Sequence, residues 1–198
     1  MKKILLIGTV LAVVIGIFLT LKSPSDEEPI HIKYSDMITI PYIKDMCKSH
    51  NLDPFGGGGG FLGGVNLIII SFASDDQVGI TQARNLLIEC SEDLLQRMNS
   101  DEQIKPYLEH YPFSEKGIEL SINYFDATSD WVPPEFIASA SVRKGKVRYS
   151  IFNHKTRKFK TVHKESYREA QNIVQSNDNI TSNSVPTENP SKHPFQIK

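Results

Sequence analysis

The sequence has few of the residues that mark metal-binding or redox proteins. Its 198 residues include only two cysteines, one tryptophan and six histidines. It contains no Cys-x-x-Cys pair, no His-Glu-x-x-His and no Gly-x-Ser-x-Gly. These absences remove the usual signatures of a zinc hydrolase, a dithiol oxidoreductase and a serine hydrolase. The sequence therefore predicts no catalytic residue, no metal ligand and no cofactor.

The chain also lacks an excess of charge of either sign. Lysine and arginine number 22 and aspartate and glutamate 23, which gives a formal net charge of -1 at pH 7. The whole molecule therefore exerts no general attraction for nucleic acid. The cations are nevertheless concentrated, because ten of them lie between Arg143 and Arg168 with Glu165 as the single acid. We call residues 143–168 the basic segment.

The basic segment is the one positive indication of function in the sequence. Aromatic residues are interleaved with its cations, a pattern that would suit a nucleic-acid surface, where cations meet phosphates and rings stack on bases. The export that the amino end predicts argues against that partner. We expect a non-catalytic binding or assembly role, in which Arg148, Lys158 and Lys160 contact an anionic lipid surface, an envelope polymer or an acidic protein. The alternative is that these side chains only solvate exposed strands and discourage edge-to-edge pairing.

The amino end predicts a membrane anchor in residues 1–22. Lys2 and Lys3 precede an uncharged run from Ile4 to Leu21, which is about 27 Å long as a helix and can span a bilayer. The positive-inside rule then exports the rest of the chain. A cleaved signal sequence is the alternative, although no small-x-small cleavage site stands near Thr20. The predicted location is the cell envelope, with the carboxyl-terminal domain outside the cytoplasm, or secretion after cleavage.

Side chains are almost absent from the stretch Pro54 to Gly64, where seven of eleven residues are glycine. The letters Gly58-x-Gly60-x-x-Gly63 match a dinucleotide-binding fingerprint, but that motif follows a strand and opens a helix, whereas here a predicted strand comes next. A membrane hairpin is a second interpretation, because residues 54–74 carry no charge. We favour a flexible glycine-rich loop, within a region of residues 23–64 that also includes a weak helical pattern broken by Pro41.

Hydrophobic periodicity predicts one α+β domain at residues 65–175. An apolar run from Leu67 to Phe72 indicates a buried strand, and apolar residues from Ile80 to Met98 recur at helical spacing. Further strands are predicted at 117–125, 136–142, 146–152 and 158–162, a closing helix at 164–175 and a disordered tail at 176–198. We therefore expect an antiparallel sheet of four to five strands with a long helix packed on one face, preceded by the amino-terminal hydrophobic anchor.

The clearest hairpin signal lies between residues 136 and 152. Lys144 and Gly145 can form a tight two-residue turn, because glycine reaches positive φ without strain. With that turn, Val142 faces Val147 and Ala140 faces Tyr149, which places an apolar set on one face of the sheet.

Two groups of residues suggest chemistry, each with an ordinary alternative. Cys47 and His50 could pair as nucleophile and base, but residues three apart in a weak helix are more often unrelated surface groups. Asp126 and Asp130 could hold a cation or act as paired carboxylates, yet aspartate beside Thr128 is ordinary turn chemistry. The alternatives to a binding role are thus an exported enzyme of unknown chemistry and a nucleic-acid-binding module.

The two cysteines, Cys47 and Cys90, could form a disulfide with each other. Under the predicted topology both lie outside the cytoplasm, where a disulfide can form and persist. However, Cys90 lies on the apolar stripe of the predicted long helix, where a free cysteine acts as a small hydrophobic residue. The sequence alone does not decide whether the two sulfurs meet.

Overall fold

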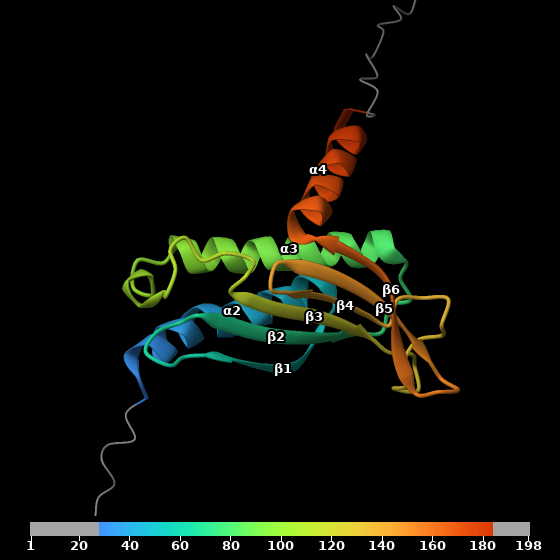
Figure 1. The fold of residues 1–198 in the computed structure, drawn as a ribbon, viewed down its shortest axis with the longest axis horizontal. Coiled ribbons are helices and arrows are strands. Elements are labelled where there is room, and N and C mark those ends of the chain that lie inside the picture. Colours follow the sequence, from blue (N-terminus) through green and yellow to red (C-terminus); the bar gives the residue numbers. More distant parts are fainter. Residues whose placement is uncertain (1–27, 184–198) are drawn as a thin grey trace, which may run out of the picture.

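A computed structural model describes residues 28–183 and shows a six-stranded sheet with three helices (Figure 1). The α+β class predicted from the sequence is therefore correct. In chain order, the elements are α2 (Ile30–His50), β1 (Asp53–Gly60), β2 (Leu67–Ser74), α3 (Ile80–Ser100), the 3-10 turn η1 (Lys105–Tyr107), β3 (Ile118–Tyr124), β4 (Ser139–Arg143), β5 (Lys146–Asn153), β6 (Lys158–Ser166) and α4 (Tyr167–Asn183).

The order of the strands in the sheet is the same as their order in the sequence, from β1 to β6. Each neighbouring pair is antiparallel except β2 and β3, which are parallel. The parallel pair arises because α3 crosses over between β2 and β3 and returns the chain to the same end of the sheet. The prediction of four to five antiparallel strands is thus matched only roughly, since the sheet has six strands and includes one parallel pair.

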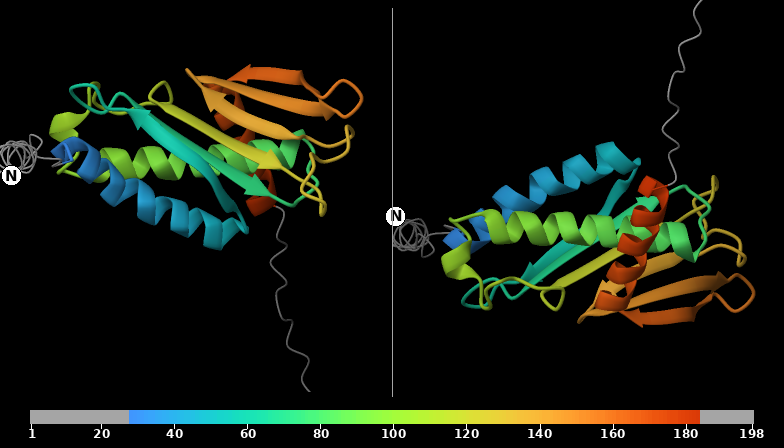
Figure 2. Two further views of the ribbon diagram at one scale, coloured as in Figure 1. Left: turned by 90° about the horizontal axis from the view of Figure 1, so that it is seen from below. Right: turned by 90° about the horizontal axis from the view of Figure 1, so that it is seen from above.

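Within residues 28–183, the three helices lie on one side of the sheet, and the opposite face carries no helix (Figure 2). The predicted apolar stripe of α3 is buried against the sheet, with Leu87, Cys90 and Leu94 fully enclosed. It packs on the inward side chains of the central strands, among them Ile118 and Ile122 of β3. The long helix therefore covers the sheet as its periodicity predicts.

The hairpin between β4 and β5 has the predicted turn and register. Lys144 and Gly145 have φ values of 51° and 68°, the left-handed pair that a tight two-residue hairpin turn requires. Val142 pairs with Val147 and Ala140 pairs with Tyr149 across the two strands. All four side chains are buried, so the predicted apolar set does face the core.

The glycine-rich stretch forms a strand as far as Gly60, so the prediction of a loop is wrong for this part and holds only for residues 61–64. Gly57, Gly58 and Gly59 of β1 pair with Ile70, Ile69 and Ile68 of β2 in an antiparallel ladder. Glycine disfavours strands by its own propensity, but the adjacent isoleucine-rich strand supplies the hydrogen bonds that fix it. The alternative interpretation of this stretch as part of a membrane hairpin is wrong for the same reason.

Residues 28–50 are more ordered than their weak pattern indicates. Helix α2 passes through Pro41 and ends at Asn51, whose φ of 51° is the left-handed value typical of a helix end. Tyr42 is fully buried and its hydroxyl donates to the Cys90 carbonyl oxygen at 2.9 Å. This bond fixes α2 against α3.

The expected transmembrane helix is not found in the part of the chain that the structure describes. None of the helices between residues 28 and 183 combines the length and the apolar character that crossing a bilayer requires. The predicted anchor from Ile4 to Leu21 lies outside the described residues. Helix α4 continues to Asn183, beyond the predicted start of the tail, and residues 184–198 also lie outside the described part.

Candidate functional site

The single acid of the basic segment is buried on the helix side of the sheet. Glu165 of β6 accepts hydrogen bonds from Arg84 of α3, with Nε–Oε1 and Nη2–Oε2 distances of 2.8 and 3.3 Å. The Tyr149 hydroxyl donates to the same carboxylate at 2.7 Å, and the His163 Nε2 atom lies 3.5 Å from it. The Arg84 and Glu165 side chains are only 10% and 6% exposed. Glu165 is thus compensated inside the domain and does not offset the surface cations around it.

The ionised state of this cluster follows from its hydrogen bonds. Burial raises the pKa of Glu165, but the hydrogen bonds from Arg84 and Tyr149 and the charge of Arg84 outweigh it, so the pKa lies below its usual value. Burial, together with the neighbouring Glu165, raises the pKa of the Tyr149 hydroxyl. At neutral pH, α3 is therefore tied to β5 and β6 through a carboxylate, a guanidinium and a neutral phenol.

The uncovered side of the sheet, which we call the open face, receives every second side chain of each strand. The register places one row of open-face residues across five strands, from β2 to β6: Ser71, Ser121, Ser141, Arg148 and Lys164. Neighbouring strands are about 4.8 Å apart, so this row extends over about 19 Å. Small hydroxyl side chains thus give way to cations toward β6.

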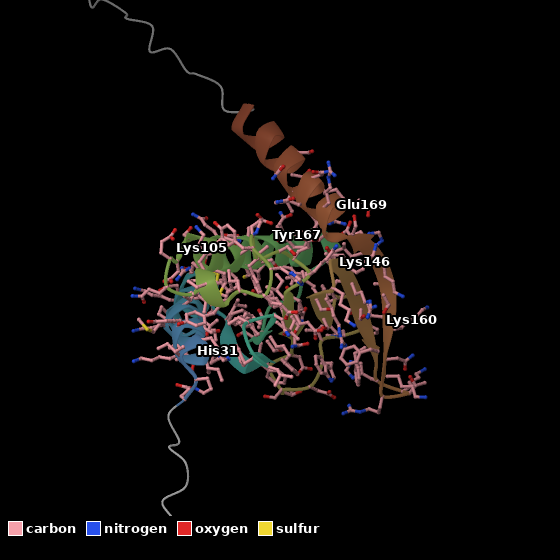
Figure 3. All side chains as sticks on the ribbon, turned by 60° about the vertical axis from the view of Figure 1, so that its left-hand side comes forward. His31, Lys105, Lys146, Lys160, Tyr167 and Glu169 are labelled. Atoms are coloured by element: carbon pink, nitrogen blue, oxygen red, sulfur yellow. The ribbon has the colours of Figure 1, made fainter. Side chains whose placement is uncertain are left out.

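Three cations gather where the open face reaches β6. Arg148 and Lys164 face each other directly across β5 and β6, and Lys146 lies two residues before Arg148 and so points to the same side. Figure 3 shows Lys146 close to Glu169, which lies in the first turn of α4. These residues line a shallow hollow of about 380 Å³ that we call the basic hollow: Lys146, Arg148, Lys164, Glu165, Ser166 and Glu169.

The second carboxylate of the basic hollow caps a helix. Glu169 accepts hydrogen bonds from the Ser166 backbone N–H and hydroxyl, both at 2.7 Å, and the Glu169 N–H donates to the Ser166 Oγ atom at 3.2 Å. This reciprocal arrangement is a capping box at the start of α4. The backbone hydrogen bond from Ser166 lowers the pKa of Glu169 below its usual value. Within residues 28–177, no carboxylate forms an ion pair with Lys146, Arg148 or Lys164.

Two other cations of the basic segment are paired at the surface. The Arg143 Nε atom lies 2.9 Å from a Glu119 carboxylate oxygen on the adjacent strand. Arg157 reaches Asp130 at 3.1 Å and its guanidinium also lies over the Phe152 ring, 5.2 Å from the ring centroid. Exposed pairs of this kind contribute little stability, but they remove these two cations from the set that is free to bind an anion.

The three residues predicted as anion contacts do not share one face. Arg148 is on the open face, whereas Lys160 pairs with Ile151 and Lys158 with Asn153, positions that point to the other side of β5. The cause is a one-residue bulge in β6, where the register shifts between Tyr149 and Ser150. Figure 3 shows Lys160 on β6 well away from Lys146, which is the first residue of β5. The structure therefore groups Arg148 with Lys146 and Lys164 instead.

A hydrogen-bonded polar network occupies the middle of the open face. Ser71 and Ser121 are linked through their hydroxyl oxygens at 2.8 Å. The Asn123 side-chain N–H donates to Ser71 Oγ at 2.9 Å, and the Ser139 hydroxyl donates to Asn123 Oδ1 at 3.0 Å. This network leaves a surface without large side chains, on which a polar ligand can approach the sheet closely.

Aromatic rings close the other end of the open face. Trp131, from the loop after β3, lies 4.4 Å from Phe125, 5.6 Å from Phe152 and 4.7 Å from Phe159 between ring centroids. Phe55 of β1 extends the group at 5.5 Å from Phe125. Phe159 and Phe55 remain 48% and 58% exposed, so part of this aromatic cluster faces solvent.

The two cysteines are free, so the disulfide considered from the sequence is not formed. Cys90 is fully buried on α3, and burial raises its pKa to about 12. Burial, together with the nearby Asp53, raises the pKa of Cys47. His50 is directed to Glu89 at 3.5 Å. A raised thiol pKa disfavours the thiolate, which makes Cys47 a poor nucleophile at neutral pH.

Asp126 is used in a turn. It accepts hydrogen bonds from the Thr128 backbone N–H at 2.8 Å, from the Thr128 hydroxyl at 2.6 Å and from the Asp130 N–H at 3.2 Å. These bonds lower its pKa, the Thr128 hydroxyl having the largest effect. Among the described residues, no group of three His, Cys, Asp or Glu side chains is placed to hold a metal ion.

Comparison with protein-family models, with curated proteins and with solved structures finds no match to this chain. The candidate site is therefore defined by its own geometry: a basic hollow, a serine-rich floor and an aromatic cluster on one uncovered sheet face.

Proposed function

We propose that the protein is a non-catalytic binding domain that holds an anionic polymer on the open face of its sheet, with the basic hollow as the main anchor. The observation that carries the proposal is the grouping of Lys146, Arg148 and Lys164 without an ion pair among the described residues. Arginine offers a planar fork for a carboxylate or phosphate group, and two lysines add point charges beside it.

This grouping works against the stability of the domain itself. Like charges placed directly opposite each other on neighbouring strands are destabilising, and Arg148 and Lys164 are such a pair. Of the two acids that line the basic hollow, Glu165 is bonded to Arg84, and Glu169 caps α4 and lies near Lys146. An external anion would relieve this repulsion.

The rest of the open face favours a polymer over a small anion. The row of serines extends about 14 Å from β2 to the cations of β5, at about 4.8 Å per strand. Hydroxyl groups can bond to the neutral part of a chain whose charged groups occupy the basic hollow. The amino-terminal sequence predicts export, so an acidic envelope polymer is preferred to nucleic acid as the partner.

The alternative of an enzyme has weaker support. Its candidate residues are engaged otherwise, because Asp126 belongs to a turn and the pKa of Cys47 is raised. In the basic hollow, the Ser166 hydroxyl and the Glu169 carboxylate are hydrogen-bonded to each other, but both are used in the cap of α4. A nucleic-acid module shares the chemistry of cations and rings, and the binding experiment tests it directly.

The proposal is tested with four probes: a polyuronate, polyphosphate, vesicles of phosphatidylglycerol and a single-stranded oligothymidine. The polyuronate or the polyphosphate is expected to bind the full-length protein at low salt. The bound polymer should dissociate as the salt concentration rises, since the Debye length falls from about 10 Å at 0.1 M to about 3 Å at 1 M. Binding of vesicles alone would reassign the partner to a lipid surface, and binding of the oligonucleotide alone would favour the nucleic-acid module.

Two matched charge reversals locate the contact. Arg148→Glu with Lys164→Glu changes the basic hollow, whereas Lys158→Glu with Lys160→Glu makes the same change of charge on the other side of the hairpin. We expect the first pair to abolish binding and the second to weaken it only slightly. Equal losses would show that net charge alone governs binding, and no binding of any probe at low salt would refute the proposal.

A further inference from the structure

Strand β1 leaves one edge of the sheet unprotected. It is the first strand and pairs only with β2 in the part of the chain that the structure describes. Four of its glycines, Gly56 to Gly59, are exposed. Natural edge strands are commonly guarded by lysine, proline, inward-pointing charges or a bulge. The start of β1 has such guards in Pro54 and in the register shift between Pro54 and Gly56, but none of them stands between Gly56 and Gly60. The backbone groups on the outer side of β1 therefore face solvent without side chains to shield them.

Packing accounts for some of these glycines but not for all. A Cβ atom at Gly59 or Gly60 would collide with the Phe61 ring or the Asn66 side chain. By contrast, a Cβ atom at Gly56 or Gly58 would meet no atom within 4 Å, and neither residue has a left-handed φ. Glycine weakens a strand interior, so its presence at these two positions has no benefit for the fold of the domain. What it provides there is an accessible backbone.

An apolar groove lies beside this edge. Helix α2, β1 and β2 enclose a hollow of about 200 Å³ with a mainly apolar lining. Its apolar side chains are those of Ile40, Ile43, Phe61, Ile68, Ile69 and Ile70, with Gly57 and Gly58 on the β1 side and the polar Asp36 and Thr39 on the helix. An apolar cavity of about 150 Å³ holds a benzene molecule, so the groove can accept one aromatic or large aliphatic side chain. Ser35, which also lines the groove, is 1% exposed, and its hydroxyl has no hydrogen-bond partner among the described residues.

We propose that β1 binds an extended segment of a partner polypeptide as a seventh strand, and that one apolar side chain of this segment enters the groove between α2 and β1. A polypeptide is the occupant that the edge specifies, because only a second backbone presents N–H and C=O groups at the spacing of a β ladder. Alternate side chains of a strand point to the same side, so the segment needs apolar residues at every second position. This site is on the edge opposite to β6 and does not depend on the basic hollow.

The direct test uses synthetic peptides of eight residues, the length of β1. Each alternates threonine with one apolar residue, which is valine, leucine, phenylalanine or tyrosine, and carries a fluorescent label for anisotropy measurements with the full-length protein. The control peptides have the same sequence with N-methyl groups on alternate backbone amides, which removes ladder donors without changing the side chains. We expect at least one parent peptide to bind saturably and its methylated form to bind at least about tenfold more weakly.

Protein variants locate the contact. Gly56→Lys and Gly58→Lys place guarding side chains where the structure has open space, and should weaken peptide binding at least about tenfold while the domain stays folded. Val162→Lys is the matched control, because Val162 is 43% exposed on the opposite edge strand. It should leave peptide binding unchanged. If no parent peptide binds, or if methylation or the glycine variants have no effect, the proposal is overturned.

Two further outcomes would replace the proposed occupant. If the wild-type protein dimerises in sedimentation experiments and Gly58→Lys abolishes the dimer, the edge pairs with a second copy of the chain. If peptides bind only after residues 184–198 are removed, the edge is occupied by the chain's own carboxyl-terminal segment. Either result would overturn the assignment to a separate partner.

Discussion

The ion pair between Arg84 and Glu165 makes a sharp prediction about stability. Replacing Arg84 with leucine would leave the Glu165 carboxylate, whose side chain is 6% exposed, with only the Tyr149 hydroxyl and His163 as partners. Removing one member of a buried pair leaves an uncompensated charge and typically costs about 3 to 5 kcal/mol. We therefore expect Arg84→Leu to lower the free energy of unfolding by that amount.

The double variant Arg84→Leu with Glu165→Leu should be less harmful than Arg84→Leu alone. It removes both charges and leaves the Tyr149 hydroxyl without its acceptor, which costs about 1 to 3 kcal/mol, whereas the exposed His163 can turn to solvent. Urea denaturation followed by circular dichroism gives the free energies, and the double-mutant cycle gives the coupling. His163→Gln is a suitable control, because its side chain is 43% exposed. A loss below about 1 kcal/mol for Arg84→Leu, or additive losses in the cycle, would refute the reasoning.

Four further predictions concern the core, a turn, acid stability and the cysteines. Leu87→Ala should cost about 2 to 5 kcal/mol in urea denaturation, because the side chain is fully buried under the sheet. Gly145→Ala should lower the melting temperature by a measurable amount, since the φ of 68° strains any residue with a Cβ atom. The pKa of Glu165 is lowered by folding, so its contribution to the free energy of unfolding is present above the unfolded pKa of about 4.5 and is lost as the pH falls through the folded pKa. Glu165→Gln should therefore flatten the acid part of the plot of unfolding free energy against pH. Thiol titration should find two free thiols after denaturation without reductant, and a result of no free thiols would indicate a disulfide and contradict the structure.

Local signals were sufficient where the information lay within a few residues of the chain. The Lys144-Gly145 turn fixed the register of β4 and β5, because a tight turn and an alternating apolar pattern admit one pairing. The stripe through Leu87 and Leu94 likewise identified the buried face of α3. Each of these features depends on contacts between sequence neighbours or on a simple period.

The failures concern features that need distant parts of the chain. The glycines of β1 have poor strand propensity and are held by hydrogen bonds to β2, so composition alone predicted a loop. The parallel pairing of β2 with β3 depends on where α3 returns the chain. A single bulge separates the three cations that the sequence grouped: with regular pairing, Lys158 and Lys160 would share the side of Arg148, and the extra residue in β6 moves both to the other side. The cations that lie beside Arg148 in the structure are Lys146 and Lys164, which the sequence showed only as members of a basic run.

The identity between strand order and sequence order has a consequence for how the protein is made. Each new strand of the sheet joins the edge left by the strand before it, so the sheet can grow one strand at a time as the chain leaves the ribosome. No strand has to insert between two that are already paired. The last strand to arrive, β6, carries Glu165, the acid that neutralises Arg84 on the much earlier helix α3. A chain interrupted before β6 would hold five strands together with a guanidinium that lacks its acid, so the buried charge of Arg84 is compensated only when the last strand of the sheet has paired.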